Sequence, residues 1–260
     1  MRLRQRIPRS RFSDVKFAAL ASWAVIGAAL CASARAQTTI SFQGFEAGDT
    51  WSISAGSGSV STAAGALDTP ANQRILAGTH SWQINAATGT LTLSSVSLTG
   101  YTDISVRYRL SATSATGSGG VDSTDYARAY LALNGAAYPS NSAANADISI
   151  VGASNSRWGY TATLTATTTA GTNLQVASPQ NGTSTNNYTT GVINIPNGNS
   201  TAAVQFVARV NGINELFNLE NVTLLGTIPS SATWDANGTT AGVGGTGTWD
   251  LTNRLSLIHI

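Results

Sequence analysis

The sequence predicts an all-β protein, an antiparallel β-sandwich of the jelly-roll kind. Apolar residues alternate with polar ones at every second position in residues 104–110 and 204–210. Successive side chains of a strand point to opposite faces, so this period indicates half-buried strands. Clusters of turn-forming residues separate the runs, and no segment has the period of an amphipathic helix. Many short strands at this spacing are typical of a sandwich.

Further strand-like runs follow one another along the chain. They cover residues 38–42, 51–54, 82–84, 90–93, 95–98, 126–133, 147–151, 160–165, 191–195 and 218–225. The turn clusters between them are residues 117–120, Asn134-Gly135, Pro139-Ser140-Asn141, Asn181-Gly182 and Pro196-Asn197-Gly198. We therefore predict one sandwich domain over residues 37–227.

Residues 1–36 have the pattern of a secretory signal peptide. A basic head ending at Lys16 precedes an apolar run over residues 17–31, and Ala34-Arg35-Ala36 forms a small-x-small cleavage signal. The apolar run is shorter than the roughly 20 residues of a membrane-spanning helix. Cys31 raises the alternative of a lipoprotein site, but Leu30 stands where such a site needs a small residue. We expect export and a mature start at Gln37.

Removal of this leader reverses the charge of the protein. The leader holds seven of the 14 basic residues and one of the 12 acidic residues, which leaves seven against 11 and a net charge of −4. No lysine follows Lys16, so the basic surface of a nucleic-acid-binding protein is absent. The single cysteine, Cys31, lies in the leader, and a mature domain without cysteine depends on its core for stability.

The residues that usually carry catalysis are sparse. His80 is the one histidine outside the C-terminal tail, which holds His259; a zinc site needs three or four ligands, and no nucleophile-elbow motif is present. Carboxylates occur at Asp122, Asp125, Glu215 and Glu220, but their spacing selects no glycosidase pair, and aspartate is common in turns. We predict that the domain is not an enzyme.

Aromatic and arginine side chains are the candidates for a binding surface. Tyr126, Arg128 and Tyr130 share one face of a predicted strand, so they point outward if the intervening apolar residues face the core. Flat aromatic faces with a few polar groups suit sugar ligands. Arg107 and Arg109 share one face of another predicted strand, which can neighbour the first. Trp158, in an expected surface loop over residues 155–160, completes the candidate set. The alternative is that the tyrosines pack and the arginines pair with nearby aspartates.

The two ends of the predicted sandwich resemble extracellular jelly-roll modules of the carbohydrate-binding and lectin-like kind. The opening sequence is Phe42-Gln43-Gly44-Phe45-Glu46-Ala47-Gly48 and the closing one is Leu219-Glu220-Asn221-Val222-Thr223-Leu224-Leu225-Gly226. The resemblance implies that the first and last strands pair. It also implies a structural calcium ion held by Glu46, Asp49 and Glu220, although Asn221 departs from the Asp-Asn that commonly stands there; apart from this ion we expect no cofactor.

After the short linker from Ile228, Trp-Asp occurs twice, at Trp234-Asp235 and Trp249-Asp250, with Gly/Thr-rich sequence between them. Residues 232–253 resemble the repeat of autotransporter-associated β-strand repeat proteins, which implies that residues 228–253 comprise a linker and the first coil of a parallel β-helix. Single coils cannot bury their apolar faces, so several must stack. We interpret residues 254–260 as translated sequencing-adapter DNA, because CTG-TCT-CTT-ATA-CAC-ATC encodes the last six residues.

Together these features predict an exported cell-surface protein of autotransporter type, on the outside of a Gram-negative-type bacterium. Its sandwich is expected to act in binding, adhesion or display, with an extracellular polysaccharide or cell-surface glycan as partner. Contact with the outer membrane would come only through a region beyond this sequence. Two alternatives stay open: an accessory domain of a secreted carbohydrate-active enzyme, whose catalytic module follows, and a structural cap for a β-helix.

Overall fold

The computed structural model describes residues 36–61, 73–178, 182–183 and 185–229. The chain divides into two units, Met1–Ala34 and Arg35–Ile260. The predicted signal peptide, apart from its last residue, lies outside the described residues, as do the predicted repeat coil at 232–253 and the tail at 254–260. In the described segments, no helix has both the length and the apolar character needed to cross a membrane.

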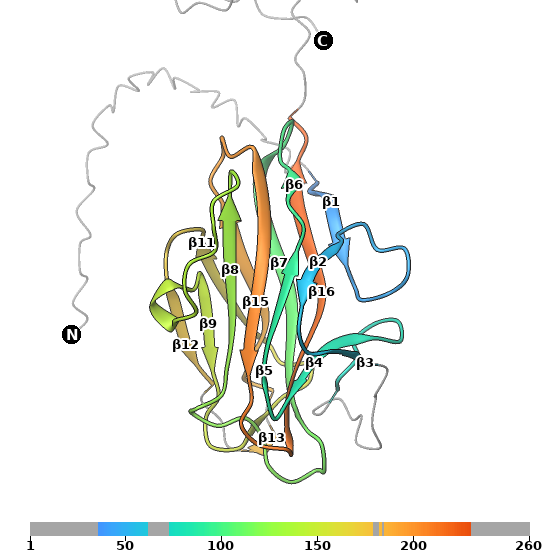
Figure 1. Cartoon of the computed structure of the whole chain (residues 1–260), viewed down its shortest axis with the longest axis vertical. Helices are drawn as coiled ribbons and strands as arrows, with labels where there is room; N and C mark the ends of the chain where they lie inside the picture. The colour runs from blue at the N-terminus through green and yellow to red at the C-terminus, as the bar shows by residue number, and fades with distance from the viewer. Residues whose placement is uncertain (1–35, 62–72, 179–181, 184, 230–260) are drawn as a thin grey trace, which may run out of the picture. The chain divides into compact units, whose positions relative to one another are not determined.

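The described residues of the second unit form a β-sandwich of two seven-stranded, mostly antiparallel sheets (Figure 1). Sheet A contains β1 (Thr38–Gln43), β3 (Ser59–Ser61), β4 (Ser81–Asn85), β7 (Thr102–Ser114), β11 (Leu164–Thr169), β14 (Tyr188–Ile195) and β16 (Glu215–Thr227). Sheet B contains β2 (Ile53–Gly56), β5 (Thr88–Leu93), β6 (Val96–Ser97), β8 (Tyr126–Leu133), β9 (Ile148–Val151), β12 (Leu174–Ala177) and β15 (Thr201–Arg209). The predicted all-β sandwich is confirmed.

The strand order of the two sheets brings the first and last strands of the domain together. Sheet A runs β11-β14-β7-β16-β4-β3, with β1 also beside β16, and sheet B runs β12-β9-β8-β15-β5-β2, with β6 beside β15. The first and last strands pair antiparallel, with Thr38 opposite Gly226 and Phe42 opposite Thr223. This is the pairing that the two end sequences predicted.

The sheets are mostly antiparallel, as predicted, and three strand pairs of the described residues are parallel. They are β9 with β12, β11 with β14, and β10 (Ser156–Arg157) with β13 (Gly182–Thr183). The chain therefore passes twice from sheet B, through the small β10–β13 sheet, to sheet A. In the first pass, the sheet B strand β9 lies inside its sheet and the sheet A strand β11 is an edge. In the second pass, the sheet B strand β12 is an edge and the sheet A strand β14 lies inside, so the two passes do not stack like the coils of a solenoid.

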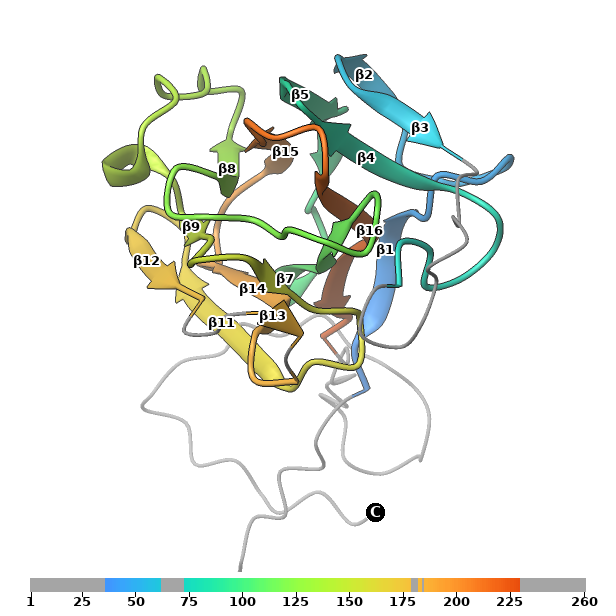
Figure 2. The ribbon, with the colours of Figure 1, turned by 90° about the horizontal axis from the view of Figure 1, so that it is seen from below.

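Alternating apolar residues from both sheets form the hydrophobic core. Figure 2 shows the strands of the two sheets end-on. On β7, Val106, Tyr108 and Leu110 are buried, and on β15 Val204 and Phe206 are buried. The ring of Tyr108 meets that of Phe206 edge-on across the two sheets, with centroids 5.0 Å apart. The period-two pattern thus predicted which face of these strands enters the core.

Turn residues end the strands largely where the sequence places them. β8 stops at Leu133, and Asn134 and Gly135 follow with φ of 56° and 77°. Asparagine and glycine tolerate this left-handed region better than other residues, so this pair can reverse the chain. The run predicted at 160–165 begins later, as β11, because Ala162 N–H bonds to Gly159 C=O in a turn.

Candidate functional site

The predicted binding residues of β8 lie on the outer face of sheet B. β8 is Tyr126–Leu133 as predicted, and Ala127 and Ala129 on the opposite face belong to the core. Tyr126, Arg128 and Tyr130 therefore point away from the sandwich interior, in agreement with the alternation. β15 is the neighbouring strand, where Arg209 stands opposite Tyr126 and Val207 opposite Arg128.

The loop between β8 and β9 covers part of this face. It includes the 3-10 helix η1 (Ala143–Asn145), and Tyr130 beneath it is only 1% exposed. The Tyr130 hydroxyl donates to Asn141 Oδ1 at 2.9 Å and to the Ser142 carbonyl at 3.1 Å. Burial raises the pKa of Tyr130 and that of Tyr138, the latter to about 12. Tyr130 therefore anchors the loop and offers no open ring to a ligand, which corrects the expectation of exposure.

Tyr126 and Arg128 remain half-buried beside that loop and are held in place by it. The Arg128 guanidinium lies 3.6 Å from the centroid of the Tyr126 ring, within the range of a cation–π contact. Arg128 also donates to Asn141 Oδ1 at 2.7 Å, and Asn141 Nδ2 donates to the Tyr126 hydroxyl at 3.0 Å. One asparagine thus fixes both side chains.

The other three candidate residues lie elsewhere. Trp158 is fully buried, and its indole N–H donates to the Leu110 carbonyl at 3.2 Å. Arg107 and Arg109 belong to β7 in sheet A, opposite Thr223 and Glu220 of β16. The expectations that Trp158 lies on a surface and that these arginines neighbour the β8 tyrosines are therefore wrong. The first expectation fails because Trp158 packs in the core, and the second fails because β7 and β8 belong to different sheets.

Arg107 and Arg109 differ from each other in exposure. Arg107 is exposed to solvent, whereas Arg109 is half-buried and donates to the carbonyls of Thr189 and Tyr160. Burial lowers the pKa of Arg109, against the raising effects of Tyr160 and Glu220. Arg109 thus serves to hold neighbouring chain segments together.

A segment before β4 covers part of the outer face of sheet A. Residues 73–80, called here the 73–80 segment, lie over β16, where the Glu220 side chain is fully buried. The N–H groups of Leu76 and Ala77 donate to the two Glu220 oxygens at 2.6 and 3.1 Å. Burial raises the pKa of Glu220 to about 7; these N–H groups act in the opposite direction, while the charge of Glu46 adds to the rise.

Glu46 holds the far end of the same segment. Its carboxylate accepts from the His80 backbone N–H at 2.7 Å and lies 3.0 Å from His80 Nδ1. The Thr79 backbone N–H, followed by the His80 side chain, lowers the pKa of Glu46 to about 2. Thr79 Oγ1 meets the same Nδ1 at 2.8 Å. In a catalytic triad, the acid and the nucleophile bond to different nitrogens of the imidazole ring. Here Glu46 and Thr79 both contact Nδ1, so the three side chains form a structural network.

The three carboxylates expected to hold calcium do not converge. Asp49 Oδ2 accepts from the N–H groups of Gly44 and Glu46 within its own turn, while Glu46 and Glu220 each hold the 73–80 segment. Among the described residues, the group whose ligand atoms lie within 4.8 Å of one another is a different one. The expected ion site at Glu46, Asp49 and Glu220 is therefore not supported by their placement.

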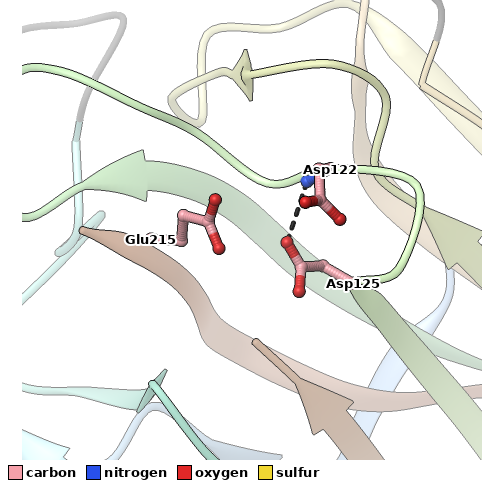
Figure 3. Close-up of side chains that lie close together, drawn as sticks. All are labelled: Asp122, Asp125 and Glu215. Atoms are coloured by element: carbon pink, nitrogen blue, oxygen red, sulfur yellow. Dashed lines mark hydrogen bonds between the residues drawn. The ribbon is translucent and has the colours of Figure 1, made fainter. Parts of the chain in front are cut away.

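That group comprises Asp122, Asp125 and Glu215, whose side chains lie close together (Figure 3). The fully buried Asp125 accepts from Asp122 N–H at 2.8 Å and from Asn211 N–H at 2.9 Å. Glu215 accepts from Gly212 N–H at 3.0 Å. Burial, and then the charge of Asp125, raises the pKa of Glu215 to about 7. Oxygen ligands of this kind suit hard cations, but each bond seen here holds a turn.

Sequence reasoning recognised these acids singly and could not bring them together. Asp122 and Asp125 precede β8, whereas Glu215 begins β16, so their meeting depends on the tertiary arrangement of two distant loops. Arg209 was also missed, although its place on the polar face of residues 204–210 was visible. The sequence matches no protein-family model, and no curated protein is significantly similar to it.

Proposed function

We propose that this chain is an exported cell-surface protein whose β-sandwich is a binding domain, with an extracellular polysaccharide or cell-surface glycan as its ligand. The observation that carries the proposal is the outer face of sheet B. There Tyr126 and Arg128 are pre-positioned by Asn141 and stand beside the exposed Arg209. Amphipathic aromatic rings combined with fixed polar groups suit the faces and hydroxyls of sugars.

Export is supported by the sequence of residues 1–36 and by the absence of cysteine after Cys31. The Trp-Asp motifs after residue 230 support a surface stalk that carries the sandwich. The fold alone favours no ligand, because one sandwich hosts many functions; the proposal therefore depends on the site rather than on the architecture.

The test is to express the full chain with its leader in a Gram-negative host. We expect the leader to be cleaved before Gln37, which mass spectrometry of the N-terminus measures, and the protein to be recovered outside the cytoplasm. We also expect retention on at least one polysaccharide of a panel of neutral and acidic polymers. An uncleaved chain in the cytoplasm contradicts export. A cleaved chain that no polysaccharide retains contradicts the binding function and favours the structural cap.

A further inference from the structure

Two arginines on adjacent strands share the open part of the outer face of sheet B. Arg209 stands opposite Tyr126, and Arg128 stands opposite Val207 two positions along β15. Arg128 and Arg209 are therefore diagonal neighbours on one face, a relation that places such residues about 7–8 Å apart. Tyr126, Arg128, Arg209 and Asn141 are called here the arginine patch.

Neither arginine has an acidic partner in the part of the chain that the structure describes. Among the described residues, the one ion pair within 4.0 Å joins His80 and Glu46, in a different part of the fold. Asp125 is close in sequence to the patch, but its two oxygens accept from the backbone N–H groups of Asp122 and Asn211. Two uncompensated cations on an otherwise acidic mature chain favour a ligand that brings negative charge.

The patch is organised before any ligand arrives. Arg128 is stacked on Tyr126 and bonded to Asn141, while the Tyr126 hydroxyl accepts from Asn141 and keeps its own proton for another acceptor. Side chains that are already fixed lose less entropy on binding. Beside Arg209 and Val207, Thr88 and Thr90 of β5 continue the same face with hydroxyl groups. Val207 itself is buried, so the accessible groups of this face run from the half-buried Tyr126 and Arg128 to the exposed Arg209 and Thr88.

We propose, as a deeper statement of the function above and resting on it, that the arginine patch binds a carboxylate-bearing polysaccharide. The planar fork of arginine matches a carboxylate with two parallel hydrogen bonds. Two separated arginines suit a polymer with about one carboxylate per sugar. A densely sulfated chain would find too few cations here and would meet a protein that is itself net negative. Tyr126 supplies an apolar edge for a sugar ring.

The experiment measures binding of the full mature chain to polygalacturonate by biolayer interferometry. We expect saturable binding that the Arg128→Ala/Arg209→Ala double variant weakens at least tenfold. Arg107→Ala is the matched control, because Arg107 is exposed but lies on β7 of sheet A; it should change the affinity less than twofold. Arg209→Lys keeps the charge but loses the fork, so an intermediate loss is expected. Thermal melting of each variant shows that it is folded.

Matched ligands separate the chemistry of the binding. Fully methyl-esterified polygalacturonan has the same backbone without the charges and should not bind. Equal binding of the esterified polymer leaves the proposed glycan function intact and overturns the carboxylate proposal. Equal or tighter binding of poly-L-glutamate, or of dextran sulfate, which carries sulfate groups but no carboxylate, also overturns it, as does a double variant that binds like the wild type. Failure of every polysaccharide to bind overturns the proposed function itself.

Discussion

The Glu220 region of sheet A and the arginine patch of sheet B use polar side chains in opposite ways. Glu220 is fully buried, and both of its oxygens receive backbone N–H groups from the 73–80 segment. Arg209 is exposed and has no acidic partner among the described residues. The Glu220 oxygens are therefore bonded within the protein, whereas the Arg209 guanidinium is accessible to the ligand that we propose. Burial and partners, rather than residue type, distinguish the structural Glu220 from the arginines of the proposed binding site.

The largest effect on stability is expected in the core. Trp158→Ala should lower the free energy of unfolding by about 3–5 kcal/mol, because a fully buried indole is replaced by a cavity. The variant also loses the indole bond to Leu110 and the edge-on contact with Phe217, whose centroid lies 6.2 Å away. Urea denaturation measures the change. Arg209→Ala is the control, and its free energy of unfolding should stay within about 0.5 kcal/mol of the wild type. A loss of similar size for Trp158→Ala would mean that the indole ring is accessible to solvent.

A smaller loss is expected from Glu220→Ala. The N–H groups of Leu76 and Ala77 would lose their acceptors, and part-buried donors left without partners should cost about 1 kcal/mol or more. Glu220→Gln keeps one acceptor oxygen and should lose less. Hydrogen exchange of residues 76–80 should accelerate in the alanine variant. Unchanged exchange there would show that Glu220 does not hold the 73–80 segment.

The same glutamate predicts a pH dependence. Its pKa is raised from 4.5 to about 7 by burial, so between these values the folded protein retains a proton that the unfolded chain has lost. Stability should therefore fall as the pH rises from about 4.5 to about 7, and level off above. Glu220→Gln should reduce the slope of stability against pH. The remaining slope should come from Glu215, whose pKa is also raised to about 7. Urea midpoints across this range measure it, and parallel wild-type and variant curves would contradict the assignment.

At the acid end, the sign reverses. The pKa of Glu46 is lowered from 4.5 to about 2 by its hydrogen bonds to Thr79 and His80. The unfolded chain binds this proton first as the pH falls, so stability contributed by Glu46 should be lost between about 4.5 and 2. Glu46→Gln should reduce that loss.

The smallest of these effects concerns the loop beside the arginine patch. Asn141→Ala removes the partner of Arg128, Tyr126 and Tyr130, and should cost about 1–2 kcal/mol. Hydrogen exchange of residues 136–146 should accelerate, and polygalacturonate binding should weaken because the patch is no longer fixed. The exposed Asn194 on β14 gives a matched control. If Asn141→Ala binds as tightly as the wild type, the fixed geometry of the patch is unnecessary.

The fold could be predicted from local pattern to a large extent. The alternation of residues 126–133 gave the bounds of β8 and its two faces, and Asn134-Gly135 gave its end. β12 escaped detection because Leu174–Ala177 is too short to establish a period. The bonds of Glu220 escaped detection because Leu76 is 144 residues away in the chain. Alternation of apolar and polar residues predicts which face of a strand is buried, whereas the strands that pair with it depend on the whole topology.

The candidate site shows the same limit. Tyr126 and Arg128 could be placed on an outward face from sequence, but the cover over Tyr130 comes from the β8–β9 loop. Trp158 stands among Asn, Ser and Gly, which suggested an exposed loop, yet its backbone pairs with Ala112 and its ring fills the core. Arg209 was visible on a polar face, and only the register of β8 with β15 joins it to Tyr126.

Arginine footprinting tests the comparison between the two sheets most directly in a single sample. The full mature chain is treated with phenylglyoxal, with and without polygalacturonate, and the modification of each arginine is quantified by mass spectrometry. We predict that the polymer protects Arg209 and Arg128, while Arg107 on β7 remains equally reactive. Protection of Arg107 with Arg209 left reactive, or no protection of any arginine, would contradict the assignment of binding to the outer face of sheet B.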